Sequence, residues 1–336
     1  MRFTVSAENN PIQGALLRSM AGTGDLSIAS LRALSPLSDK AQVLVDQAVV
    51  EVGLNRLVVA ADVLAAGLVY PLADPLSVTQ VEWDNVSQSG GAQRTMSPSA
   101  RGEHQLVDRT HLRVPIYLTT DDFSIGTRTL KMSQRVGQPI DTTLVGQATR
   151  RVNESIEDAF INGSGLVSGG YQAYGLLNAP NANTQSLTVD WDSAAELAAY
   201  TAGPKIFNDV QIAIGKLQAD KKYGPYTLYV GTLYGNALNS DFKSNGTVTI
   251  KQRLEQIEAG GRNLQIRVAD QMPADKMVLV QMTSDVVQMI SGQAPTVIPW
   301  TSLDGFTLYW LVMGIMVPRV RSDYDGNSGV CIGSYP

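Results

Sequence analysis

Residues 150–165, RRVNESIEDAFINGSG, contain the end of the clearest helical pattern in this sequence and the glycine turn that stops it. Upstream of this turn, apolar residues recur every four positions through residues 140–162 and form one slowly drifting stripe. The stripe contains Ile140, Leu144, Ala148, Val152, Ile156 and Phe160. Pro139 and Asp141 suit a helix start, because proline fits the first turn and a carboxylate interacts favourably with the positive end of the helix dipole. The pattern predicts one long helix whose core residues are Leu144, Val152, Ile156 and Phe160.

The segment after this helix, GSGLVSGGYQAYG at residues 163–175, has the composition of a phosphate-binding loop. Such a loop must follow a strand and open a helix, whereas this one follows a helix. We therefore interpret it as a turn, which leads into YGLLNAP at residues 174–180.

Upstream of the helix, residues 77–86 and 104–119 alternate between apolar and polar side chains, as strands do. They flank a polar segment, QSGGAQRTMSPSARGE, which predicts a long two-stranded ribbon with a polar tip. An isolated hairpin is marginally stable in water, so we expect the ribbon to lie on a neighbouring subunit. The alternative is a mobile surface hairpin. The residues expected to make intersubunit contacts are Trp83, Arg94, Arg101, Glu103, Asp108 and Arg109.

The remaining segments mix helical and strand patterns, which predicts an α+β protein. Residues 1–35 suggest an extended arm, and Ser38 can cap an amphipathic helix that follows it. We expect a helical stretch to begin near Ser124 and another helix to end near Asp220. The segments TLYVG, LQIRVA, KMVLVQM and VVQMIS are predicted strands, and FTLYWLVMGIMVPRV is predicted to be one buried strand or a pair.

Composition limits the function. Charged residues make up 17% of the chain, against about 25% in typical soluble domains, which is typical of a surface covered by partners. The net charge is −5, so we do not expect sequence-specific DNA binding, which usually requires a basic excess. The apolar runs are too short to cross a bilayer, so no membrane contact is expected. A single cysteine, Cys331, excludes an intrachain disulfide, and we expect synthesis in a reducing cytoplasm.

The sequence also lacks a recognisable catalytic constellation. The two histidines, His104 and His111, lie seven residues apart on one predicted strand and would point to opposite faces. The carboxylate pairs at residues 121–122 and 157–158 are adjacent in sequence and suit helix caps or solvated surfaces. We predict no catalytic, metal-binding or cofactor-binding residue, no cofactor and no enzymatic activity.

Taken in order, three stretches resemble the Hong Kong 97-type capsid fold, which tailed-phage capsid proteins share with encapsulins. PLSDKAQVLVDQAVVEVG is similar to a proline-led segment that opens an amphipathic helix in encapsulins. LVDRTHLRVPIYLTTDDFSIG looks like the returning strand of the extended loop. RRVNESIEDAFINGSG followed by YGLLNAP looks like the end of the spine helix, with a fold motif at Gly163, Gly175, Leu176, Leu177 and Asn178. The resemblance covers about residues 35–180, and the remainder matches by pattern alone.

The resemblance implies a domain plan. Residues 1–70 would form the N-terminal arm and first helix, and residues 71–122 the extended β-hairpin loop. Residues 123–180 and 295–336 would form the peripheral domain with its long spine helix. Residues 181–294 would form the axial domain.

The resemblance also implies a function. The chain would be a major capsid protein that assembles with itself into pentamers and hexamers of an icosahedral shell around phage double-stranded DNA, without sequence-specific contacts. Expected partners are a portal protein and separate scaffolding or decoration proteins, and the expected location is the virion capsid, assembled in the host cytoplasm. The alternative is an encapsulin-type nanocompartment around a cargo enzyme. The long ribbon and the arm favour the virus, since encapsulins are shorter in both places.

Overall fold

The computed structural model describes residues 57–87, 94, 96, 107–135, 143–244, 246–302 and 304–335. The predicted arm, the Ser38 cap and most of the ribbon tip lie outside these residues. The described chain divides into two compact units. The first unit contains residues 119–153 and 294–314, and the second contains residues up to 118, 154–293 and 315 onward.

In the first unit, strand β4 (Thr119–Gly126) pairs antiparallel with β14 (Thr307–Val320). Helix α5 (Thr127–Arg135) follows β4 directly. The helix expected near Ser124 is present and begins slightly later, at Thr127. Side-chain exposure alternates along β4, and Phe123 stacks on Trp310 of β14 at 5.8 Å between ring centroids. This cross-strand packing favours strand over helix until Gly126.

Strand β14 is one continuous strand of 14 residues, and β13 (Val287–Thr301) is its neighbour in a sheet ordered β1-β13-β14-β4. Within the second unit, β1 (Val69–Pro71) pairs parallel with β13. Helix α4 (Val59–Ala65) precedes β1.

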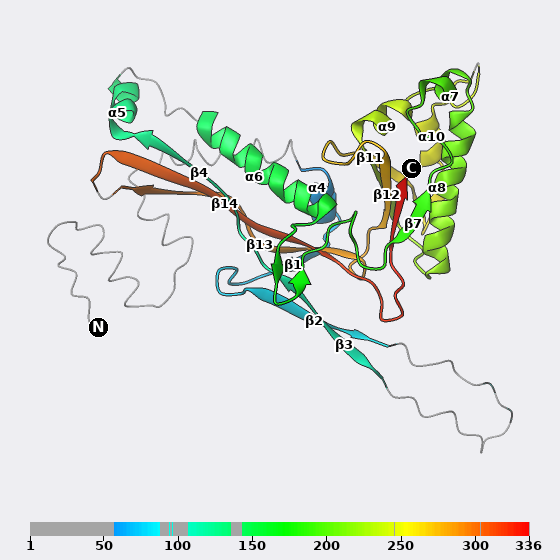
Figure 1. Ribbon diagram of the computed structural model, residues 1–336, viewed down its shortest axis with the longest axis horizontal. Coiled ribbons are helices and arrows are strands. Elements are labelled where there is room, and N and C mark those ends of the chain that lie inside the picture. The colour runs from blue at the N-terminus through cyan, green and yellow to red at the C-terminus, as the bar shows by residue number, and fades with distance from the viewer. Residues whose placement is uncertain are drawn as a thin grey trace. The chain divides into compact units, whose positions relative to one another are not determined.

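A five-stranded sheet ordered β11-β8-β12-β15-β7 forms the largest core of the second unit. Its central strands are β8 (Tyr226–Val230) and β12 (Lys276–Gln281), and helix α8 (Ala202–Ala219) lies along the sheet (Figure 1). Ile206, Leu217 and Leu228 are completely buried between helix and sheet. The other strands are β7 (Asn183–Ser186), β11 (Gln265–Val268) and β15 (Val330–Ser334). Short helices α7 (Ala194–Ala198), α9 (Thr232–Ala237) and α10 (Ile250–Glu255) complete this part.

Strand β15 was not anticipated as a separate strand. It pairs antiparallel with β12 and parallel with β7. The domain plan grouped it with residues 295–336, yet both of its partners come from the segment 181–294. Its short sequence, VCIGS, has no flanking signal that says which sheet it joins.

The predicted ribbon is present as β2 (Gln80–Val86) and β3 (Arg109–Pro115), an antiparallel pair in which Trp83 faces Leu112. Its base packs against its own chain, because Val81 and Val114 join a buried cluster with Ala173, Ile290 and Val317. The residues of β3 nearer the tip are exposed. The remaining short pairs are β5 (Val167–Ser168) with β6 (Tyr171–Gln172) and β9 (Glu258–Ala259) with β10 (Arg262–Asn263).

The predicted long helix is α6 (Thr143–Asn162). Val152, Ile156 and Phe160 are buried, but Leu144 is 38% exposed, so its assignment to the core is wrong. In an α-helix, eight residues advance about 80° beyond two full turns, whereas seven fall only about 20° short of them. Leu144 has therefore rotated off the face that Val152 occupies, and Val145 takes the buried place.

Paired substitutions test this buried face. Val152→Asp would place an unpaired charge in the core and should lower the free energy of unfolding by about 3–5 kcal/mol. Leu144→Asp keeps its charge in water and should cost at most about 1 kcal/mol, mainly through helix propensity. Urea unfolding followed by circular dichroism measures both, and equal losses would contradict the assignment.

Candidate functional site at the helix end and hairpin base

The predicted fold motif completes the C-terminal end of α6. The last carbonyl groups of a helix have no partner within the helix. Here Leu176 N donates to Phe160 O and Leu177 N donates to Ile161 O, both at 2.8 Å. The chain that returns after the glycine turn thus supplies the missing donors.

Two glycines of this motif are required by close approach. A side chain on Gly175 would place its Cβ 2.4 Å from the Gly163 amide nitrogen. Gly163 has a φ of +84°, where a side chain is strained, and packs against the Asn178 amide. Asn178 Oδ1 in turn accepts a 2.6 Å hydrogen bond from Gly175 N. All five residues of the predicted motif therefore meet in one tight turn.

Glu157 belongs to the carboxylate pair at residues 157–158, which the sequence predicts to cap a helix or lie on a solvated surface, and it is a buried residue of α6. It accepts hydrogen bonds from Val59 N at 2.6 Å and Ala60 N at 3.2 Å, and so caps helix α4 from a position 98 residues later. Burial raises the pKa of Glu157, against the opposing effect of these backbone donors. The contact ties the first described helix to α6.

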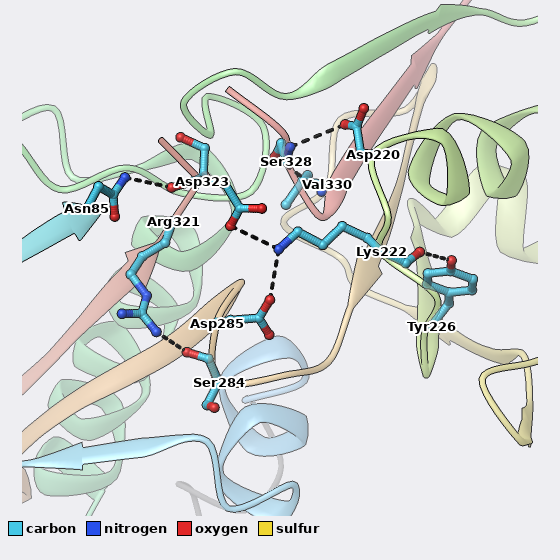
Figure 2. Close-up of polar contacts among 11 residues, drawn as sticks. Asn85, Asp220, Lys222, Tyr226, Ser284, Asp285, Arg321, Asp323, Ser328 and Val330 are labelled. Carbon is cyan, nitrogen blue, oxygen red and sulfur yellow. Dashed lines mark hydrogen bonds and ion pairs between the residues drawn. The ribbon is translucent and has the colours of Figure 1, made fainter. Parts of the chain in front are cut away.

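A second polar cluster lies beside the base of the hairpin, as Figure 2 shows. Lys222 has only 8% of its side chain exposed and donates to Asp285 Oδ2 at 2.8 Å and Asp323 Oδ1 at 3.1 Å. Arg321 donates to Ser284 O, and Asn85 of β2 donates to Ser322 O at 2.8 Å. The cluster joins the hairpin, the α8–β8 connection and the loops before β13 and after β14.

Charge complementarity sets the pKa values in this cluster. Burial alone would lower the pKa of Lys222, but hydrogen bonds to Asp285 and Asp323 outweigh it, and the pKa lies above its usual value. Burial would raise the pKa of Asp285, but hydrogen bonds from Lys222 and Thr283 hold it below its usual value. The ionised forms of both partners are thus favoured.

A groove of about 400 Å³ opens at the hairpin base. Its walls include Trp83, Tyr171, Tyr174, Arg321 and Tyr324. Polar and aromatic walls of this kind are typical of surfaces that contact other chains.

The predicted contact residues of the ribbon do not all lie in one place. Trp83 is half-buried against the hairpin's own core cluster and also lines the groove, so its expected intersubunit contact stays a prediction. Arg94, Asp108 and Arg109 are exposed, and Asp108 O extends the ribbon by accepting from Ser87 N at 2.9 Å. Arg101 and Glu103 lie outside the described residues.

The described residues offer little for catalysis. His111 is exposed and pairs with Asp84 across the ribbon, and Cys331 is fully buried, which raises the pKa of its thiol to about 11. Within the described ranges, no three or more histidine, cysteine, aspartate or glutamate side chains gather as metal ligands would. No helix in the same ranges combines the length and apolar character needed to cross a membrane.

Comparison with known proteins agrees with a capsid fold. A family model described as "Family of unknown function (DUF6260)" matches residues 66–333. No curated protein matches the sequence. The capsid of Myoviridae phage XM1 is 12% identical with a TM-score of 0.62, over 81% of this chain and 91% of that chain.

Two further solved structures are similar. The capsid of the native GTA particle is 13% identical with a TM-score of 0.58, over 83% of this chain and 91% of that one. The virus-like particle from Pyrococcus furiosus is 14% identical with a TM-score of 0.57, over 86% and 98%. Identities this low establish the fold alone, and the predicted α+β Hong Kong 97-type capsid fold is confirmed.

The close approach of Gly175 generates one prediction. Gly175→Ala should destabilise the chain by about 2 kcal/mol or more, because backbone must move to admit the Cβ. Gly215→Ala is the matched control, since Gly215 lies in α8 with no atom near its Cβ position. This control should stabilise by about 0.4–1 kcal/mol. Denaturant unfolding measures both, and changes in the free energy of unfolding that have the same sign for the two substitutions would refute the account.

The Lys222 cluster generates a pH prediction. An aspartate with a lowered pKa stabilises the fold above its unfolded value, about 3.9, and loses that contribution as pH falls through the folded value. The raised pKa of Lys222 acts at high pH instead. Its contribution to stability is complete below the unfolded value of about 10.4 and is lost as pH rises through the folded value. Lys222→Met should therefore cost about 1–3 kcal/mol at pH 7. The cost should shrink below about pH 4, as the pH falls through the lowered pKa of Asp285. Urea unfolding at pH 7, 4 and 3 measures this, and a cost independent of pH would contradict it.

Proposed function

This chain belongs to the DUF6260 family, and we propose that it is the major capsid protein of a tailed bacteriophage. The observation that carries the proposal is the β2–β3 ribbon on a capsid-type fold. Burial along β3 is confined to its base, and Arg109, Thr110 and His111 are exposed. A two-stranded ribbon exposed on this scale gains stability when another subunit covers it.

We assign assembly roles to the parts as follows. The ribbon within residues 71–122 reaches a neighbouring subunit, and the arm within residues 1–70 adds a second contact. Residues 123–180 and 295 to about 322 form the peripheral domain around α6. Residues 181–294 form the axial domain, and β15 joins them because it pairs there.

The proposed contacts of the ribbon are polar. Arg94, Asp108 and Arg109 are exposed, and Arg101 and Glu103 belong to the same tip in the sequence. Each exposed ion pair contributes only about 0–1 kcal/mol. Repetition over many copies makes the sum decisive for assembly.

Assembly would give pentamers and hexamers that close an icosahedral shell around double-stranded DNA. The net charge of −5 suits a wall that does not bind the genome by sequence. A portal and separate scaffolding or decoration proteins would be further partners. The protein would assemble in the host cytoplasm, reside in the virion capsid, and act structurally and not as an enzyme.

The second candidate is a nanocompartment shell around a cargo enzyme. The fold is also similar to that of the virus-like particle from Pyrococcus furiosus. The long ribbon and the arm favour the phage.

The contents of native particles distinguish the two functions. We expect particles purified from their source to contain nuclease-protected double-stranded DNA of genome length. Particles that instead hold one abundant folded enzyme and no DNA would establish the nanocompartment.

Deleting residues 88–102 tests the ribbon. The deletion leaves β2, β3 and the buried cluster at their base intact, so the subunit should keep its unfolding midpoint. The yield of particles in sedimentation should fall strongly, because the intersubunit contacts are lost. Shells of normal yield and stability from this variant would refute the clamp.

A further inference from the structure

Arg319 of β14 is a buried arginine held between two aromatic rings. Its guanidinium carbon lies 4.9 Å from the ring centre of Tyr70 and 5.3 Å from that of Trp83. The residue is only 5% exposed, and it donates one hydrogen bond, to Gln288 Oε1. Its Nε has no hydrogen-bond partner in the part of the chain that the structure describes. The rings and the glutamine fix the guanidinium plane.

This buried cation lacks a counter-charge. Among the described residues, Arg319 forms no ion pair with a carboxylate, and the charged side chain that acts on it most is Arg321, which repels it. Burial, followed by this repulsion, lowers the pKa of Arg319 to about 10. Buried charges in folded proteins are normally paired, as Lys222 is with two aspartates. The site is therefore incomplete among the residues that the structure describes.

Two polar atoms near Arg319 also lack hydrogen-bond partners among the described residues. These buried atoms are Trp83 Nε1 and Arg321 Nε. Both residues line the groove at the hairpin base, and Tyr70 beside Arg319 is 40% exposed. The unpaired donors thus gather where the proposed intersubunit ribbon leaves its own subunit.

We propose that Arg319 is the socket for a carboxylate side chain of a second copy of this chain, which pairs with the guanidinium on assembly. The inference rests on the proposed capsid function, which supplies the second copy. Charge complementarity supports that partner, because the chain carries 31 acidic and 26 basic residues. A guanidinium with a fixed plane favours a bidentate carboxylate, and exclusion of water strengthens the pair.

Removing the charge separates assembly from folding. Arg319→Met keeps an unbranched apolar side chain against the rings and removes a charge that no carboxylate in the described ranges neutralises. The unfolding midpoint of the unassembled subunit should stay the same or rise. The protein concentration needed for assembly should increase about tenfold or more.

Arg253→Met is the matched control. Arg253 also stacks on an aromatic ring, at 5.4 Å from Phe207, and donates to a glutamine, but it is exposed. This control should leave assembly unchanged. If Arg319→Met lowers both the unfolding midpoint and the assembly yield, Arg319 has only a structural role. If Arg319→Met assembles like the wild type, the inference is also wrong.

A crosslink identifies the source of the carboxylate. Arg319→Lys retains the charge and introduces an amine that a carbodiimide joins directly to a contacting carboxylate. In shells assembled from mixed ¹⁴N and ¹⁵N chains, we expect mixed-isotope peptides linked at residue 319. Links within one isotope alone would overturn the assignment to a second copy. A wild-type chain that never associates would refute the capsid function and this inference together, whereas shells without the mixed link refute the inference alone.

Discussion

The approach of Gly175 to the C-terminal end of α6 is the constraint on which the second unit depends. Phe160 and Ile161 end a buried helix with carbonyl groups that need donors, and the returning chain at Leu176 and Leu177 supplies them. Only a glycine at position 175 lets the backbone come close enough. This turn fixes the direction in which the chain leaves toward β7 and the five-stranded sheet. At the same end of α6, Glu157 fixes helix α4.

Two buried cations near the hairpin base, Lys222 and Arg319, differ in how their charge is neutralised. Lys222 is neutralised within its own chain by Asp285 and Asp323, so that cluster stabilises the isolated subunit. Arg319 has stacking partners and one amide but no carboxylate among the described residues. The charge of Lys222 is thus neutralised within one subunit, whereas Arg319, beside the ribbon, has no carboxylate partner among the described residues. This difference favours association, because Arg319 would gain its ion pair only in the assembly.

The sequence predicted elements whose signal is local. The period of α6, the alternation of β2 and β3 and the glycine turn after Asn162 depend on neighbouring residues, and each element is present. Leu144 was misplaced because a four-residue repeat drifts around a helix. Pairing between β4 and β14 moves the start of the helix expected near Ser124 to Thr127, and β15 joined a sheet that its five residues do not specify. For the same reason the sequence missed Lys222 and did not name the helix that Glu157 caps, since their partners lie 63 and 98 residues away in sequence. The order of the motifs, by contrast, was sufficient to identify the capsid fold.

The central claim is that this fold is completed by copies of itself. A cryo-electron microscopy reconstruction of the purified, assembled protein tests it most directly. The account predicts closed icosahedral shells in which the β2–β3 ribbon of each subunit lies against a neighbouring subunit. A protein that stays monomeric at every concentration and salt condition, or shells in which the ribbon contacts only its own chain or solvent, would contradict it.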